Sequence, residues 1–238
     1  MRELNDTLTD ALLEPILARE PAAPRITHYD DSTGARIELS GLTLANWAAK
    51  TANMIRDEFG LTAGARVSVL LPAHWQTAAV LLGCWWAGTE VVLVPDADAE
   101  LALVSAARMN ETDDIAEVAA LSLDPMGGPV ADLPVGITDF ATSVRAHGDQ
   151  FHPAGAGAAL DGASVAQTLE SARASAQRQG FTAADRVLST SEWDTPARLL
   201  DGLLAVYAAG ASLVQVTAAD PERMEHRADV ERVTVRRP

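Results

Sequence analysis

Two stretches of the chain share one order of apolar and polar positions. In each, a segment with apolar residues at helical spacing is followed by a glycine, a short apolar run, a second apolar helix and an Ala-Gly pair. The octapeptides that begin at Gly60 and Gly180 are identical at five of their eight positions. A repeat of this length is too long for a solenoid and is typical of two related α/β halves.

The order strand, helix, strand in each half requires a crossover connection, which predicts parallel sheets. The turn-forming residues 30–34 separate two short apolar segments and predict a hairpin. The segment 101–109 fits a helix or a strand, and the acidic run 111–114 is expected to begin a solvated helix. The other predicted helices are 8–19, 44–59, 75–87, 137–146, 164–179 and 221–229, and the predicted strands are 26–29, 37–39, 67–71, 91–94, 118–123, 187–190 and 232–235.

Charge and composition exclude several classes of partner. The 238 residues include 33 acidic and 18 basic ones, and the formal net charge is -15. This charge repels phosphate backbones and anionic bilayers, so we expect no nucleic-acid or membrane partner. The N-terminal residues lack the apolar segment of a signal peptide, and the longest apolar stretch, 77–88, is too short to span a bilayer. A cytoplasmic location is therefore expected.

Two residue types are nearly missing. Lys50 is the only lysine beside 17 arginines, a bias that with the abundant alanine resembles proteins of high-GC bacterial genomes. Any chemistry that needs a lysine must use Lys50. Cys84 is the only cysteine and lies in an apolar helix, which predicts a buried, inert thiol and excludes a disulfide within the chain.

Several motifs in sequence order are similar to the adenylate-forming enzymes, the group of acyl-CoA synthetases, peptide-synthetase adenylation domains and luciferases. The motifs are the helix containing Trp47, the segments 60–67 and 70–72, the apolar helix ending at Ala87-Gly88, and the later segments 185–187, 209–211 and 231–234. The resemblance implies the N-terminal domain of that family, an α/β fold of two flavodoxin-like, Rossmann-like parallel-sheet halves with flanking helices. We divide the chain into a first half at 1–147, with the N-terminal helix and hairpin, and a second, shortened half at 148–238, together one compact unit.

The resemblance also predicts where a phosphate loop would lie, and the sequence departs from it there. In the family this loop is rich in Ser, Thr and Gly and ends in Pro-Lys-Gly before the helix that here begins near Ser164. The corresponding positions retain Gly155, Gly157 and Gly162, whereas Asp161 replaces the lysine and no hydroxyl remains. Exchanging an attraction for a repulsion about 4 Å from a phosphate changes the energy by about 4 kcal/mol for each term at an effective dielectric near 20. We therefore expect no ATP binding and no cofactor.

The family's later motifs have no counterpart either. The aromatic-Gly-x-Thr-Glu segment, the ribose-binding aspartate and the C-terminal domain with its catalytic lysine are absent, and Lys50 lies in a helix of the first half. We therefore expect a truncated relative with no catalytic residues that acts as a binding or protein-interaction module. The alternative is a subunit of a split AMP-dependent synthetase that a partner completes. Because the second half is shortened, 213–216 or 233–235 is expected at an open edge, which favours a homodimer or a partner complex.

Other candidate sites have simpler structural interpretations. Residues 155–160 match most of a dinucleotide fingerprint but favour a small-residue linker, and 162–166 resemble a nucleophile elbow but favour a helix cap. No histidine has a metal-ligand spacing, so no metal site is expected. His74 and Trp75 follow the C-terminal end of a predicted parallel strand, where such sheets bind ligands. They form a possible ligand loop, although packing at the helix start is the favoured interpretation.

Overall fold

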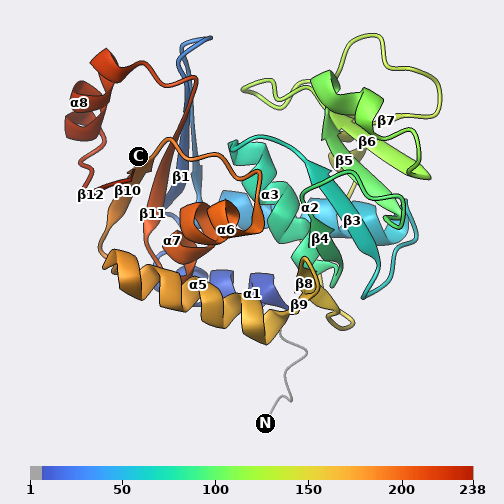
Figure 1. Cartoon of the computed structure of the whole chain (residues 1–238), viewed down its shortest axis with the longest axis horizontal. Coiled ribbons are helices and arrows are strands. Elements are labelled where there is room, and N and C mark those ends of the chain that lie inside the picture. Colours follow the sequence, from blue (N-terminus) through green and yellow to red (C-terminus); the bar gives the residue numbers. More distant parts are fainter. Residues whose placement is uncertain (1–6, 238) are drawn as a thin grey trace.

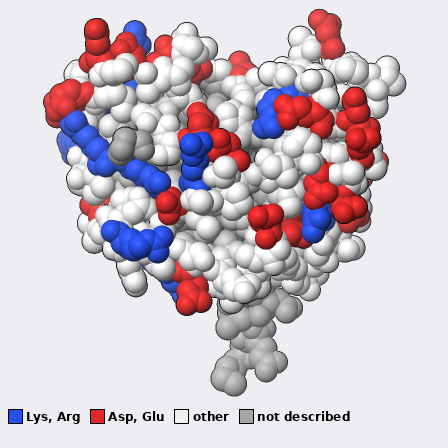
Figure 2. Space-filling model, viewed as in Figure 1, with Lys and Arg blue, Asp and Glu red and all other residues white. Residues whose placement is uncertain are grey.

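The computed structural model describes residues 7–237, which form two β-sheets with helices packed around them (Figure 1). Figure 2 shows that both acidic and basic side chains lie on the same face of the molecule. The α-helices are α1 (Leu8–Arg19), α2 (Gly41–Asp57), α3 (Trp75–Trp86), α4 (Phe140–Val144), α5 (Val165–Gln179), α6 (Pro196–Leu199), α7 (Ala205–Ala208) and α8 (Pro221–Val230). A 3-10 helix, η1 (Ala106–Glu111), and a π-helix, η2 (Leu200–Leu204), complete the helices of this range. The strands are β1 (Pro24–Asp30), β2 (Ala35–Ser40), β3 (Arg66–Leu70), β4 (Glu90–Val92), β5 (Leu101–Ser105), β6 (Glu117–Leu121), β7 (Thr138–Asp139), β8 (Ala158–Leu160), β9 (Ala163–Ser164), β10 (Arg186–Ser189), β11 (Ser212–Thr217) and β12 (Val235–Arg237).

The larger sheet has the strand order β7-β6-β5-β3-β4-β8-β9. All of its neighbouring strands pair in parallel except β8 and β9, which form an antiparallel pair. The smaller sheet has the order β12-β10-β11-β1-β2, and only β1 and β2 pair antiparallel, as the predicted hairpin. The expected α/β architecture with parallel sheets is confirmed.

The two octapeptides of the repeat lead into comparable strands of different sheets. The segment from Gly60 precedes β3, and β4 pairs in parallel with it after α3. The segment from Gly180 precedes β10, and β11 pairs in parallel with it after α6, η2 and α7. The second repeat is two residues longer between the matching positions Val187 and Ala209 than the first is between Val67 and Ala87, and this part of it contains the π-helical turn η2.

The division between the sheets does not follow the division at residues 147 and 148. Strands β1 and β2 lie in the smaller sheet with the C-terminal strands, because β1 pairs in parallel with β11 over five residues. Strands β8 and β9 lie in the larger sheet, because β8 pairs with β4. Segments far apart in the sequence therefore complete each sheet, and the blue β1 lies beside the orange β11 in Figure 1.

Most predicted elements form for local reasons, and some boundaries differ. Thr7 and Asp10 form a capping box that begins α1 at Leu8, and Ser40 caps α2. The segment 101–109 is a strand followed by the 3-10 helix η1, and the acidic run 111–114 lies at the end of η1, so the predicted helix start there is wrong. The predicted helix 137–146 is a two-residue strand followed by the short α4, and the last strand begins at Val235 rather than at 232.

Only one of the two segments that were expected at an open edge lies near an edge of the smaller sheet. Residues 213–216 belong to β11, which lies between β10 and β1, so the expectation of an open edge there is wrong. Strand β12 occupies the edge beside β10. The β11 segment gains its second neighbour because the N-terminal hairpin joins this sheet, a pairing that no local pattern predicts.

The outer face of the smaller sheet carries a buried carboxylate, Glu231, at the end of α8. Tyr29 donates its hydroxyl hydrogen to Glu231 at 2.5 Å, the Arg36 Nε donates at 2.9 Å, and Arg186 donates to the other carboxylate oxygen. Burial opposes ionisation, but these hydrogen bonds outweigh it and lower the pKa of Glu231 to about 2. This group, the Glu231 cluster, ties the end of α8 to the first two strands and β10.

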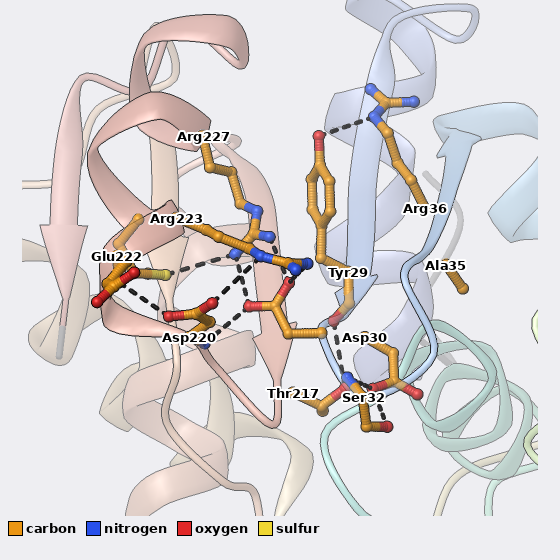
Figure 3. Close-up of polar contacts among 12 residues, drawn as sticks. Tyr29, Asp30, Ser32, Ala35, Arg36, Thr217, Asp220, Glu222, Arg223 and Arg227 are labelled. Carbon is orange, nitrogen blue, oxygen red and sulfur yellow. Dashed lines mark hydrogen bonds and ion pairs between the residues drawn. The ribbon is translucent and has the colours of Figure 1, made fainter.

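A buried ion pair from Arg227, in the last turn of α8, also holds this helix in place. The Arg227 guanidinium donates to both carboxylate oxygens of Asp31, at 2.5 and 3.1 Å, and both side chains are less than one tenth exposed. The same guanidinium carbon lies 4.2 Å from the centre of the Tyr29 ring (Figure 3). Helix α8 is therefore held against the β1–β2 hairpin by charge as well as by apolar packing.

Candidate ligand-binding site

The inner face of the smaller sheet changes from apolar to polar along its strands. Ile26 pairs with Leu213, and both belong to the main hydrophobic core. Two residues further on, His28 pairs with Gln215, and both polar side chains are buried. The next pair on this face includes Thr217. The C-terminal ends of these parallel strands thus form a polar layer where such sheets usually bind ligands.

His74 of the other sheet meets this layer. It is the N-cap residue of α3, and its ring lies edge-on to that of His28, with ring centres 4.2 Å apart. Burial lowers the pKa of His28 to about 4 and that of His74 to about 3, and in His74 the neighbouring His28 adds to the effect. Both rings are therefore neutral at pH 7.

Hydrogen bonds assign the ring protons. The His74 Nδ1 accepts the backbone N–H of Gln76 at 3.2 Å, so its Nε2 carries the proton. The Thr217 hydroxyl donates to the Tyr29 carbonyl oxygen at 3.2 Å and lies 3.0 Å from the His28 Nε2. The His28 Nε2 is therefore the donor of that pair, and its Nδ1 is the unprotonated nitrogen.

A cavity of about 250 Å³ opens between the two sheets at this point, and we call it the inter-sheet cavity. It is lined by His28, Asp30, Ser32, Ala35, Pro72, His74, Leu123, Pro125, Glu192, Thr217 and Ala218. No lysine or arginine is among these residues. Leu123 and Ala218 both have a positive φ, 59° and 48°, a conformation that residues other than glycine adopt rarely and that is found most often at functional sites.

The structure separates the two residues of the predicted ligand loop. His74 lines the inter-sheet cavity, whereas Trp75 does not. The Trp75 indole is 3% exposed, packs edge-on to Trp47 at 5.5 Å and donates its N–H to the Pro125 carbonyl oxygen at 3.2 Å. Trp75 therefore holds the loop that forms one wall of the cavity.

The four positions assigned to the phosphate loop lie in two places. Gly155 and Gly157 precede β8 and pack against the turns at Gly64 and Gly88, where a Cβ on Gly157 would lie 2.5 Å from the Gly64 Cα. Asp161 and Gly162 form the turn of two residues between β8 and β9, with φ values of 47° and 79°. This turn and the two-residue strand β9 precede α5.

The N–H groups around that turn already have partners. Asp161 donates to the Val91 carbonyl oxygen at 3.0 Å, and Gly162 donates to the Glu90 carboxylate at 2.8 Å. Ser164 and Gln167 form a capping box, so the N–H groups of both residues bind side-chain oxygens of the pair. Ser164 thus caps a helix, as predicted, and the turn brings a second carboxylate, Glu90, beside Asp161.

The two other candidate side chains lie elsewhere. Lys50 lies in α2 and donates its ammonium hydrogen to the His147 carbonyl oxygen at 2.6 Å. Cys84 is fully buried, and burial raises the pKa of its thiol to about 12, which agrees with the predicted inert thiol. Within residues 7–237, no group of three or more His, Cys, Asp and Glu side chains is placed to hold a metal ion, and no helix is long and apolar enough to cross a membrane.

Sequence reasoning missed five polar residues of the cavity, His28, Asp30, Ser32, Glu192 and Thr217. His28 lies in a predicted strand and Asp30 begins the predicted turn, but their place depends on the pairing of β1 with β11, which links segments more than 180 residues apart. Glu192 follows the C-terminal end of β10, and Thr217 is the last residue of β11. The rule that parallel sheets bind ligands at these ends is the signal that could have found them.

Comparison with solved structures identifies the fold. An acyl-CoA synthetase of Brucella canis matches 97% of this chain and 47% of its own length, with a TM-score of 0.79 and 17% identity. MatB of Rhodopseudomonas palustris matches 98% of this chain and 49% of its own length, with a TM-score of 0.76 and 17% identity. A benzoate CoA ligase of Burkholderia xenovorans LB400 covers 97% of this chain and 50% of its own, with a TM-score of 0.74 and 17% identity. The chain therefore has the fold of the N-terminal part of AMP-dependent acyl-CoA ligases and spans about half the length of these structures.

A sequence relative matches nearly all of this chain. The chain matches no family model. A TIGR03089 family protein of Mycobacterium tuberculosis (strain ATCC 25618 / H37Rv) is 55% identical over 236 residues, which are 96% of this chain and 97% of the relative. An identity this high over both chains shows common ancestry, and the protein belongs to the TIGR03089 family.

Proposed function

We propose that this protein is a non-catalytic binding or protein-interaction module that keeps the adenylate-forming scaffold without its ATP site. The observation that carries the proposal is the turn at Asp161 and Gly162. A phosphate loop needs free backbone N–H groups and a positive side chain. Here the N–H groups of the turn and of the α5 capping box bind protein oxygens, and the nearby side chains are two carboxylates, Glu90 and Asp161.

Electrostatics supports the same proposal. A phosphate placed about 4 Å from a carboxylate is repelled by about 4 kcal/mol per charge pair at an effective dielectric near 20, and by less where solvent screens it. Asp161 is exposed, whereas Glu90 is 7% exposed and is paired with Arg66 at 3.2 Å. Freeing the Gly162 N–H for a phosphate would also break its bond to the buried Glu90. The repulsion by the carboxylates and the loss of this hydrogen bond would both lower the affinity of the chain for ATP.

The direct test is a calorimetric titration of the full chain with Mg-ATP, together with an assay of acyl-dependent pyrophosphate release. We expect no heat of binding up to millimolar ATP and no pyrophosphate with any acid of a fatty-acid and aryl-acid panel. The Glu90→Gln variant separates charge from geometry, because it removes one charge and keeps the size of the side chain. It is expected to stay inactive, since the capping box remains. Micromolar ATP affinity in the unaltered protein would overturn the proposal.

The second candidate is a subunit of a split synthetase. The observation in its favour is that the chain spans about half of the acyl-CoA ligases with the same fold. Such a subunit would bind ATP once its partner was present. Pull-down from an actinobacterial lysate followed by the pyrophosphate assay tests it, and activity of the reconstituted pair would favour this candidate over the non-catalytic module.

A further inference from the structure

The inter-sheet cavity carries negative charge. Burial opposes ionisation of Asp30, but hydrogen bonds from Ser32 and Thr33 outweigh it and lower the pKa of this carboxyl, so Asp30 is ionised at pH 7. Glu192 is exposed at the rim, with one carboxylate oxygen 3.5 Å from the backbone nitrogen of Ala73, directly before His74. With no lysine or arginine in the lining, an anion would meet two like charges and no opposite one.

His74 offers one unused donor. The side chain is 6% exposed, and its Nδ1 is occupied by Gln76. Its Nε2–H has no hydrogen-bond partner among the described residues. The described residues with a fully buried, unpaired polar atom do not include His74, so its Nε2–H is accessible at the wall of the cavity that His74 lines. An acceptor atom of a ligand in the cavity can therefore pair with it.

The volume and the apolar walls of the cavity further limit the class of ligand that can bind. The cavity of about 250 Å³ lies below the range of about 300–1,000 Å³ that holds drug-sized ligands, so it is too small for a nucleotide or coenzyme A. Pro72, Leu123, Pro125 and Ala218 supply apolar walls that suit one ring or a short hydrocarbon chain.

We infer that the inter-sheet cavity binds a small organic cation, an amine that also carries a neutral oxygen, and rejects carboxylates and phosphates. The ammonium lies toward Glu192 and Asp30, the oxygen accepts from the His74 Nε2–H, and the hydrocarbon part packs on the apolar walls. This inference deepens the proposed binding function and rests on it, since it names the class of ligand that the module takes.

Four probes with one phenyl skeleton test each part. They are 2-amino-1-phenylethanol, mandelate, 1-phenyl-1,2-ethanediol and 2-phenylethylamine, which vary the charge and the hydroxyl in turn. Each probe is titrated into the full chain, and binding is measured by calorimetry and ligand-observed NMR. The amino alcohol is expected to have a dissociation constant on the order of 1 mM. The diol and the simple amine are expected to bind several-fold more weakly, and mandelate is expected not to bind.

Variants locate the binding. Glu192→Gln is expected to weaken the amino alcohol about threefold to fivefold, as for a partly exposed ion pair. Glu170→Gln removes the same charge from an exposed position on α5 and is expected to change nothing. His74→Asn keeps a residue that caps helices well. It is expected to weaken binding of the amino alcohol and to leave binding of 2-phenylethylamine unchanged.

Three results would overturn the inference. The first is that mandelate binds as tightly as the amino alcohol, and the second is that the variants at Glu192 and Glu170 have equal effects on binding. The third is that no probe binds at a concentration 10-fold above the expected dissociation constant. None of these results bears on the ATP titration. Failure of the proposed function would appear there instead, as nucleotide affinity at the β8–β9 turn.

Discussion

Replacing Glu231 by glutamine is expected to destabilise the protein strongly at neutral pH and less in acid. The change removes the charge at the centre of the Glu231 cluster and keeps the size of the side chain. The folded-state pKa is about 2 against an ordinary value of 4.5, a difference that corresponds to about 3 kcal/mol of folding free energy at pH 7. Because the folded-state pKa is lowered, this stabilisation is complete well above pH 4.5 and is lost as the pH falls toward 2. At pH 3.5 about 2 kcal/mol remains.

Urea unfolding followed by circular dichroism, at pH 7 and pH 3.5, measures both values for the unaltered protein and for Glu231→Gln. The comparison cancels the protonation of the other carboxylates, which both proteins share. Glu225→Gln is the matched control on the same helix, because Glu225 pairs with Arg236 at an exposed position and its loss is expected to change stability little. A Glu231→Gln variant as stable as the unaltered protein at pH 7, or equally destabilised at both pH values, would refute the reasoning.

Three further outcomes follow from the fold. Gly88→Ala is expected to lower the free energy of unfolding by about 1–3 kcal/mol in the same urea assay. The reason is that φ of Gly88 is +80° and the added Cβ would lie 2.3 Å from the Gly155 carbonyl oxygen. Unchanged stability would contradict that geometry. Cys84 is expected to resist a thiol reagent at pH 8 until urea unfolds the chain, and rapid labelling of the native protein would show that the helix opens. We propose self-association at the β12 edge, so light scattering at tens of micromolar should show a dimer that Val235→Asp dissociates, whereas an unaltered monomer in both would exclude it.

Local signals predicted most of the helices and central strands. Capping residues such as Thr7 and Ser164 mark helix starts within a few residues, and the apolar runs at β3 and β10 follow the segments that begin at Gly60 and Gly180. The wrongly predicted elements were those whose structure depends on pairing with neighbouring strands. Residues 137–146 carry a helical pattern, yet the first of them pair with β6 and leave room for only a short helix.

The candidate site could be predicted only in part, because long-range pairing builds it. His74 follows a parallel strand and was found by that rule. His28 lies beside it only because β1 pairs with β11, which no pattern within the hairpin reveals. The phosphate-loop positions show the opposite problem. Matching backward from Gly162 spread the loop over the eight residues 155–162, whereas only Asp161 and Gly162 lie between β8 and β9, and Gly155 packs elsewhere.

The place of the N-terminal hairpin has a consequence for synthesis of the chain. Strand β1 ends at Asp30, and its partner β11 begins at Ser212, so ribosomes that add about 5–20 residues per second make them on the order of 10–40 s apart. During that interval β1 has β2 on one side and an unpaired edge on the other. The β1 edge therefore stays unpaired until β11 emerges, and a ribosome that stalls before Ser212 leaves an aggregation-prone strand exposed near the N-terminus.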